Sequence, residues 1–168
     1  IFLPHGQPLN AGDVLRQPEL AATYRAIAEQ GSDWFYRGPF AQTVGAWMEA
    51  HGGILTAQDF ANYHIVLREP VTTSYRGKKV VSFPPPSSGG VHVIELLNIL
   101  ERFKLGTLDE ATRLHLIAEA MKLAFADRTY WLGDPDFAQV PRGLIAKKYA
   151  ATLARQIHLD HASEVSSH

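Results

Sequence analysis

Residues 84–103 read PPPSSGGVHVIELLNILERF, and this stretch decides how the rest of the chain is arranged. Three consecutive prolines exclude a helix and predict a stiff extended segment. Ser87 and Ser88 supply hydroxyls that favour the start of a helix, which we expect from about Gly89 to Phe103. The polar positions of this helix form one narrow stripe: His92, Glu95, Asn98 and Arg102. A helix with so little polar surface is covered on most sides, so it belongs inside a larger structure.

Helical patterns flank this stretch on both sides. Pro18 and Gly31 are placed to begin and end one helix, and a second is expected from Pro39 to about His51. Thr56 with Asp59 three residues later resembles a capping box.

Downstream, Asp109 caps a helix that is expected to run to about Tyr130. We predict its core-facing residues to be Leu114, Ile117, Met121 and Phe125. A last helix is expected over residues 147–157, and the polar residues 158–168 are expected to fray.

Three short runs of β-prone residues lie between the helices, at residues 64–69, 71–75 and 78–83. Pro70 and the Arg76-Gly77 pair separate them. Together with the helices they predict an α+β fold, predominantly helical with a few short strands. Neither a repeat nor a linker interrupts the chain, so residues 1–168 are expected to form a single unit.

Composition excludes several classes of function. The chain has 168 residues, 46% of them hydrophobic and 20% charged, as in an ordinary globular protein. A formal net charge of −1 gives no electrostatic footprint for nucleic acid. The absence of cysteine excludes disulfides, thiolate zinc sites and cysteine nucleophiles. Beginning at Ile1 rather than Met, the chain is expected to be processed, excised or partial.

Each candidate site in the sequence has a simpler structural interpretation, which we favour. Ser87-Ser88-Gly89-Gly90 opens a helix and could bind an anion, but it lacks the following Lys and Ser or Thr of a phosphate loop. A helix cap with closely packed glycines is the preferred interpretation. No G-x-S-x-G elbow marks a serine nucleophile, although composition does not exclude a Ser-His-Asp triad.

The ionisable clusters do not predict a metal site or a cofactor. His115, Glu119 and Lys122 share a helical face, where an ion-pair row is favoured over two metal ligands. Around the turn after the long helix lie Asp127, Arg128, Asp134 and Asp136. There we expect Arg128 to bind Asp134 or Asp136 and fix the loop, rather than a calcium site. His158 and His161 suit adventitious metal binding without a function.

Five strings, in this order and spacing, resemble the γ-glutamyltransferase (γ-glutamyltranspeptidase, glutathione hydrolase) family over nearly the whole chain. They are PELAATYRAIAEQGSDWFYRG (18–38), GGILTAQDFANY (52–63), REPVTTSYRG (68–77), PPPSSGG (84–90) and AFADRTYWLGDPDF (124–137). The resemblance implies an N-terminal-nucleophile hydrolase, an αββα sandwich made from a proenzyme that cuts itself into a large and a small chain. It also implies that a threonine released by the cut attacks the γ-amide carbonyl, with its own α-amine as base, to form a γ-glutamyl ester.

This chain resembles the later part of the family's large chain, before the threonine. Ile1 has no hydroxyl or thiol and cannot be an N-terminal nucleophile. The family's carboxylate-binding arginine lies upstream and its other ligands downstream, so no catalytic, substrate-binding or metal-binding residue is assigned here. Neither Arg68 nor Arg128 is that arginine, since both belong to other family strings.

The resemblance implies that the complete protein cleaves γ-glutamyl amides and transfers the group to water or an amine, with no cofactor. The expected partners are a small γ-glutamyl substrate and a small subunit carrying the threonine, and the segment alone is expected to be inactive. Its exposed apolar surface favours association with a partner or with itself. An acylase of the same fold, acting on a β-lactam side chain or poly-γ-glutamate, and a non-catalytic scaffold are the alternatives. By family analogy the location is periplasmic or secreted.

Overall fold

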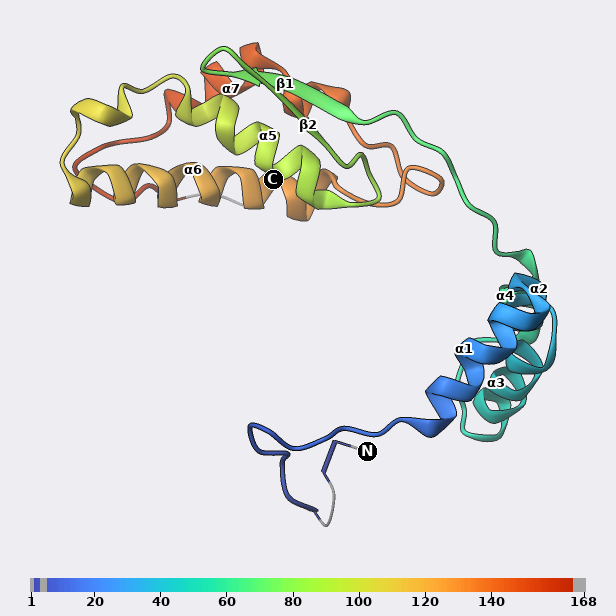
Figure 1. Ribbon diagram of the computed structural model, residues 1–168. Helices are drawn as coiled ribbons and strands as arrows, with labels where there is room; N and C mark the ends of the chain where they lie inside the picture. Colours follow the sequence, from blue (N-terminus) through green and yellow to red (C-terminus); the bar gives the residue numbers. More distant parts are fainter. Residues whose placement is uncertain (1, 4–5, 165–168) are drawn as a thin grey trace. The chain divides into compact units, whose positions relative to one another are not determined.

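The computed structural model describes residues 2–3 and 6–164, in two compact units, residues 1–66 and 67–168 (Figure 1). That residues 1–168 form a single unit stays a prediction, and the contacts of the chain group it into these two parts, with the boundary after Val66. The division falls in a run whose side chains are exposed, including Ile65 at 77% and Leu67 at 92%. Ile1, excluded above as a nucleophile, lies outside the described residues.

The first unit is helical. Helix α1 (Pro18–Gln30) confirms the predicted helix and ends at Gly31, whose φ of 77° favours glycine. That residue turns the chain directly into α2 (Ser32–Tyr36), a short helix that the sequence analysis did not predict. This helix was missed because five residues are too few to show helical periodicity.

Aromatic rings form the contacts that hold the first unit together. Helix α3 (Pro39–Ala50) confirms the second predicted helix, and the predicted capping box of Thr56 and Asp59 begins α4 (Ala57–Asn62). Phe35 of α2 stacks on Phe40 of α3 with ring centroids 4.3 Å apart, and both rings meet Phe60 of α4 edge-on. Three helices are therefore joined through their aromatic side chains.

The second unit begins with an antiparallel hairpin of β1 (Val71–Tyr75) and β2 (Lys78–Ser82), in which Val71 pairs with Ser82. These strands confirm two of the three predicted runs. The third, residues 64–69, is not a strand, and its prediction was wrong. A β-prone run becomes a strand only where a neighbouring strand takes up its backbone hydrogen bonds, and that run has no such neighbour among the described residues.

The Arg76-Gly77 pair closes the hairpin as a two-residue turn. Both residues have positive φ, 47° and 77°, as a turn that matches the twist of the strands requires. Gly77 adopts this conformation freely, whereas Arg76 does not. The backbone N–H of Arg76 donates a hydrogen bond of 2.6 Å to Oε1 of Glu101, which helps to hold the turn.

The proline run turns instead of extending, which corrects the sequence prediction. Residues 85–86 form a turn, and the peptide bond between Pro85 and Pro86 is cis. The turn leads into α5 (Ser88–Leu100), whose N-cap is Ser87, although no side-chain hydrogen bond caps the helix. A Cβ on Gly90 would lie 1.9 Å from the carbonyl oxygen of Phe83, so this glycine allows the helix to begin against the chain that leaves β2.

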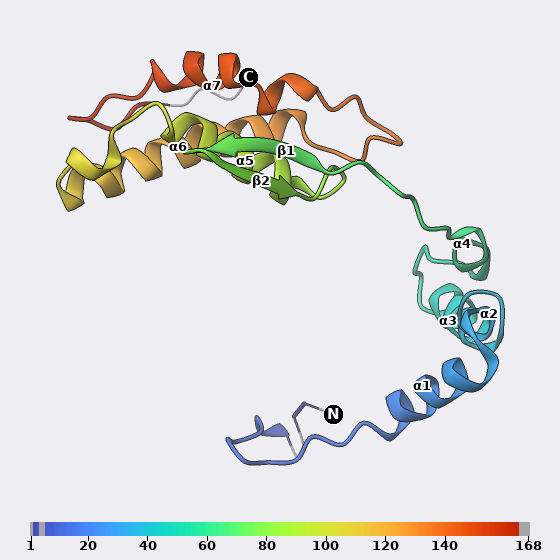
Figure 2. The same cartoon turned by 45° about the horizontal axis from the view of Figure 1, so that its top comes forward.

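Helix α5 is the centre of the second unit, as its apolar sequence predicts. It contacts the hairpin, α6 (Glu110–Trp131) and α7 (Lys147–Ala154), which lie on different sides of it (Figures 1 and 2). The core is made of side chains from all three helices: Ile99, Leu100, Leu116, Ala120, Leu123, Ala150, Leu153 and Ala154. The predominantly helical α+β fold is therefore confirmed.

Helix α6 buries a face that agrees only in part with the one predicted. Asp109 caps it as expected, through a 2.9 Å hydrogen bond from the Thr112 N–H. Three of the predicted core residues, Leu114, Met121 and Phe125, are 58%, 40% and 45% exposed, whereas the fourth, Ile117, is partly buried and packs against the core. The buried face is instead formed by Leu116, Glu119, Ala120, Leu123, Ala124 and Asp127. Apolar residues lie on more than one face of α6, and its packing against α5 and the rest of the core decides which of them are buried.

A loop and two short 3₁₀ turns complete the second unit. The turns are η2 (Leu105–Thr107), before α6, and η3 (Arg142–Ile145), before α7. Helix α7 ends three residues earlier than expected, at Ala154. In the part of the chain that the structure describes, no helix combines the length and apolar character needed to span a bilayer.

Candidate functional site

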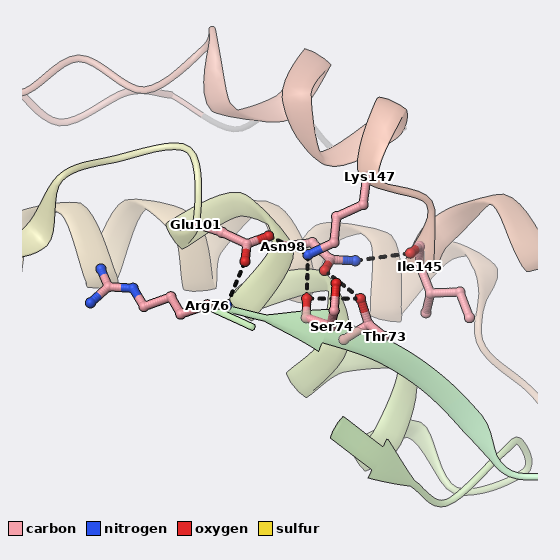
Figure 3. Close-up of polar contacts among 7 residues, drawn as sticks. All are labelled: Thr73, Ser74, Arg76, Asn98, Glu101, Ile145 and Lys147. Atoms are coloured by element: carbon pink, nitrogen blue, oxygen red, sulfur yellow. Dashed lines mark hydrogen bonds and ion pairs between the residues drawn. The ribbon is translucent and has the colours of Figure 1, made fainter. Parts of the chain in front are cut away.

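Three residues of the predicted polar stripe, His92, Glu95 and Asn98, lie in α5 and join it to its neighbours, whereas Arg102 lies after the helix and is exposed. Asn98 is fully buried, at 0% exposure. Its Oδ1 accepts a 2.8 Å hydrogen bond from the Thr73 hydroxyl on β1, and its Nδ2 donates one of 2.8 Å to the Ile145 carbonyl (Figure 3). One amide therefore connects the hairpin, α5 and the turn that precedes α7.

A second polar group lies one helical turn further along, at Glu101. Its carboxylate forms an ion pair with Lys147 at the start of α7 and accepts the Arg76 N–H (Figure 3). The Lys147 ammonium also donates to the Ser74 carbonyl of β1. These hydrogen bonds, that from Lys147 first, lower the pKa of Glu101, so this carboxylate stays ionised at neutral pH.

A buried acidic pair lies on the face of α5 toward α6. Glu95 and Asp127 are each 1% exposed, and their side chains are hydrogen-bonded to each other. Burial, and then the hydrogen bond and negative charge of Asp127, raise the pKa of Glu95 to about 10. Glu95 is therefore protonated at neutral pH.

Tyr149 of α7 completes this pair. Its hydroxyl donates a 2.6 Å hydrogen bond to Oδ2 of Asp127, and its pKa is raised, first by burial and then by that bond. Oε1 of Glu95 is buried without a hydrogen-bond partner among the described residues. The cluster thus places the protonated carboxyl of Glu95 and the phenol of Tyr149 in hydrogen-bond contact with the same side chain, that of Asp127.

Polar groups also fix the beginning of α5 to α6. The His92 ring donates from Nδ1 to the Ala124 carbonyl at 3.2 Å and packs edge-on against Phe125. Burial lowers the pKa of His92, so the ring is neutral at neutral pH. The Arg128 guanidinium donates from Nε to the Ser88 hydroxyl at 3.0 Å.

This arrangement corrects the predicted role of Arg128 and supports one interpretation of the Ser-Ser-Gly-Gly run. The loop after α6 is fixed by Arg68, whose Nη2 lies 2.7 Å from Oδ2 of Asp136 and 3.6 Å from Oδ1 of Asp134. Arg128 points instead to Ser88, because its place on α6 faces the start of α5. Gly90 packs against Phe83, which confirms the close packing in the preferred interpretation, whereas the expected side-chain cap of the helix is not formed.

A cleft of about 560 Å³ opens beside this loop, between the hairpin, the start of α5 and η3. Its volume is in the range of small-molecule sites. Prolines form much of its wall, and Arg68, Glu69 and Arg142 are its charged residues. Arg68 is paired with Asp136, and the other two charged residues, Glu69 and Arg142, have opposite charges. The cleft therefore has mixed rather than single-sign charge.

The ion-pair row predicted on α6 is confirmed for Glu119 and Lys122, whereas His115 bonds to a backbone carbonyl instead. Lys122 Nζ lies 2.8 Å from Oε1 of Glu119, and His115 donates from Nε2 to the His158 carbonyl at 2.8 Å. Oε2 of Glu119 accepts the Ser163 N–H at 3.0 Å. Burial raises the pKa of Glu119, but the hydrogen bonds from Lys122 and Ser163 outweigh it, so the pKa is lowered. The row therefore holds the chain after α7 onto α6.

Sequence reasoning identified part of the buried cluster and missed the rest. Glu95 and Asn98 were placed on a polar stripe of an apolar helix, which was the correct signal. Asp127 was assigned to a surface turn, and Tyr149 was not singled out. No pattern along the chain connects Asp127 with Tyr149, because α7 brings them together from 22 residues apart.

The profile of the gamma-glutamyltranspeptidase family matches residues 1–168. The chain belongs to that family. It is 44% identical over 169 residues to a glutathione hydrolase proenzyme of Escherichia coli, covering 99% of this chain and 29% of that protein. It is 43% identical over 165 residues to an acylase proenzyme of a Pseudomonas species, covering 96% of this chain and 30% of that protein.

A solved gamma-glutamyltranspeptidase has the same fold. The Helicobacter pylori enzyme superposes with a TM-score of 0.88 at 40% identity, covering 96% of this chain and 48% of that one. The chain is thus a helical segment of the family's N-terminal-nucleophile hydrolase fold and spans less than a third of the curated relatives it matches. That this gamma-glutamyltranspeptidase segment carries no catalytic or substrate-binding residue stays a prediction.

Proposed function

We propose that the complete protein cleaves γ-glutamyl amide bonds, such as that of glutathione, and transfers the γ-glutamyl group to water or an acceptor amine. The observation that carries this proposal is the family match over residues 1–168, together with 44% identity to a glutathione hydrolase proenzyme. The attacking group is a threonine outside this chain, made N-terminal by self-cleavage. Its α-amine serves as the base that activates the hydroxyl.

In this proposal the chain is the framework of the enzyme. Asn98 and the Glu95–Asp127–Tyr149 cluster use their polar groups to join α5 to its neighbours, which suits a structural role. The large apolar side chains exposed on α6, Leu114, Met121 and Phe125, provide a surface for the rest of the protein. A small subunit that carries the threonine is the proposed partner.

Release of chromophore from a γ-glutamyl anilide tests the proposal. The complete protein should turn the substrate over, while residues 1–168 alone should not, because the nucleophile is absent. Sustained turnover by residues 1–168 would contradict the assignment of the nucleophile to another segment. Inactivity of a correctly processed complete protein on all γ-glutamyl donors would contradict the substrate class.

An acylase is the second candidate, favoured by 43% identity to an acylase proenzyme over almost the same share of the chain. Such an enzyme removes an acyl side chain from a β-lactam or cuts poly-γ-glutamate by the same ester chemistry. A direct comparison of kcat/KM on the γ-glutamyl anilide, an acylated cephalosporin and poly-γ-glutamate distinguishes the candidates. A reading frame that stops after His168 would instead indicate a scaffold without catalysis.

Two further expectations accompany the proposal. On family analogy we place the complete protein in the periplasm or outside the cell, and fractionation of cells with an antibody to the chain tests this. The exposed apolar face of α6 should make residues 1–168 self-associate when separated from the rest. Sedimentation velocity of this segment should show concentration-dependent oligomers, which a Leu114→Ser and Phe125→Ser variant reduces.

A further inference from the structure

A cluster of metal-ligating side chains lies just after α7. His158, Asp160 and His161 each offer a ligand atom, and these atoms all lie within 4.8 Å of one another. The two imidazole rings stack with centroids 4.4 Å apart, and Nδ1 of His161 lies 2.9 Å from Oδ1 of Asp160. Three ligands from four consecutive residues thus converge on one point of the surface.

We propose that His158, Asp160 and His161 bind a divalent zinc ion. Two imidazole nitrogens and one carboxylate oxygen are ligands that zinc accepts, at about 2.0–2.2 Å, with water completing a four-coordinate site. Calcium and magnesium prefer sites made wholly of oxygen, which two imidazoles do not provide. The three side chains are exposed, so an ion reaches them from solvent and small side-chain rotations bring the ligands to bonding distance.

The backbone that carries these ligands is already fixed. On one side, the His158 carbonyl accepts a 2.8 Å hydrogen bond from Nε2 of His115 on α6. On the other, the Ser163 N–H donates to Glu119, and the Ser163 carbonyl accepts from Lys122. The sequence analysis expected residues 158–168 to fray, whereas the described part of this segment is held at both ends of the cluster.

Fixation of this kind distinguishes the cluster from a mobile histidine-rich tail. A flexible tail loses conformational freedom when it closes around an ion, and that loss weakens binding. Here the loop is ordered before the ion arrives, so a smaller loss of conformational freedom opposes the binding free energy. Occupancy in turn strengthens the attachment of the loop to α6.

Titration calorimetry of the intact protein with zinc chloride, in a buffer that does not chelate zinc, tests the proposal. The variants are His158→Ala, His161→Ala and Asp160→Asn, with His64→Ala as a matched control that removes an exposed imidazole from another part of the chain. Each ligand variant should bind zinc about tenfold or more weakly, since even loss of an outer-shell partner costs 10–100-fold. His64→Ala should leave zinc affinity unchanged.

A second readout reports the ligands directly. Zinc should shift the NMR signals of the His158 and His161 rings at one equivalent, whereas magnesium at the same concentration should not. The replaced side chains are exposed, so circular dichroism of the metal-free variants should match the parent. Equal zinc affinity in the parent and the His158→Ala, His161→Ala double variant would overturn the proposal. Equal ring shifts with magnesium would also overturn it.

Discussion

Replacement of Glu95 by Gln should change how the stability of the protein depends on pH. Glu95 has its pKa raised from 4.5 to about 10, chiefly by burial. The folded state therefore holds a proton that the unfolded chain releases. This contribution to stability is fully present below pH 4.5 and is lost progressively as the pH rises toward 10.

The size of the effect follows from the shift. Between the two pKa values the free energy of unfolding falls by about 1.4 kcal/mol for each pH unit. From about pH 5 to about pH 8 the loss from this one group is about 4 kcal/mol, a large part of the ~5–15 kcal/mol that stabilises a typical domain. Glu95→Gln has no proton to lose and still offers an N–H to Asp127, so this loss should disappear.

Urea unfolding at several pH values measures the effect. In a background where Trp34 and Trp47 are replaced by Phe, fluorescence reports on Trp131, the tryptophan of the second unit. The difference in unfolding free energy between Glu95→Gln and its parent should grow with pH in favour of the variant. Two parallel curves from about pH 5 to about pH 8 would refute the reasoning that burial keeps Glu95 protonated.

Glu101→Gln is the matched control, since Glu101 follows the same helix and has the opposite shift. The pKa of Glu101 is lowered by hydrogen bonds from Lys147 and the Arg76 N–H. Its contribution is present above pH 4.5 and is lost as the pH falls through the lowered value. Glu101→Gln should therefore be less stable than its parent at neutral pH, and the difference should shrink in acid.

Four further substitutions test the packing of the second unit. Gly90→Ala should destabilise it by about 3 kcal/mol in urea unfolding, because the new methyl meets the Phe83 carbonyl, and wild-type stability would contradict that contact. Asn98→Leu should lower the free energy of unfolding by about 2–4 kcal/mol in thermal unfolding, since two buried partners lose their hydrogen bonds. A loss under about 1 kcal/mol would mean that water replaces the amide. Arg68→Met should speed hydrogen exchange at residues 133–138, and Arg128→Met should not; equal exchange in both would restore Arg128 as the residue that fixes the loop.

Local sequence signals predicted the helices well and their packing less well. Pro18, Gly31 and the Thr56–Asp59 capping box act within one helical turn, so the boundaries that they define were confirmed. The run at residues 64–69 has the composition of a strand, but a strand also needs a neighbour that its composition does not provide. Likewise α6 carries apolar residues on more than one face, and its sequence alone does not determine which face packs against α5.

The amino-acid sequence alone determined the family of this protein, the central burial of α5 and the side-chain caps that begin α4 and α6. These properties depend on residue identity and on spacings of a few residues, where backbone geometry allows few alternatives. Only the tertiary structure decided that Arg68 rather than Arg128 binds Asp136, and that Glu95 meets Asp127. Such contacts join side chains that are 30 or more residues apart, and their partners are selected by how whole helices pack against one another.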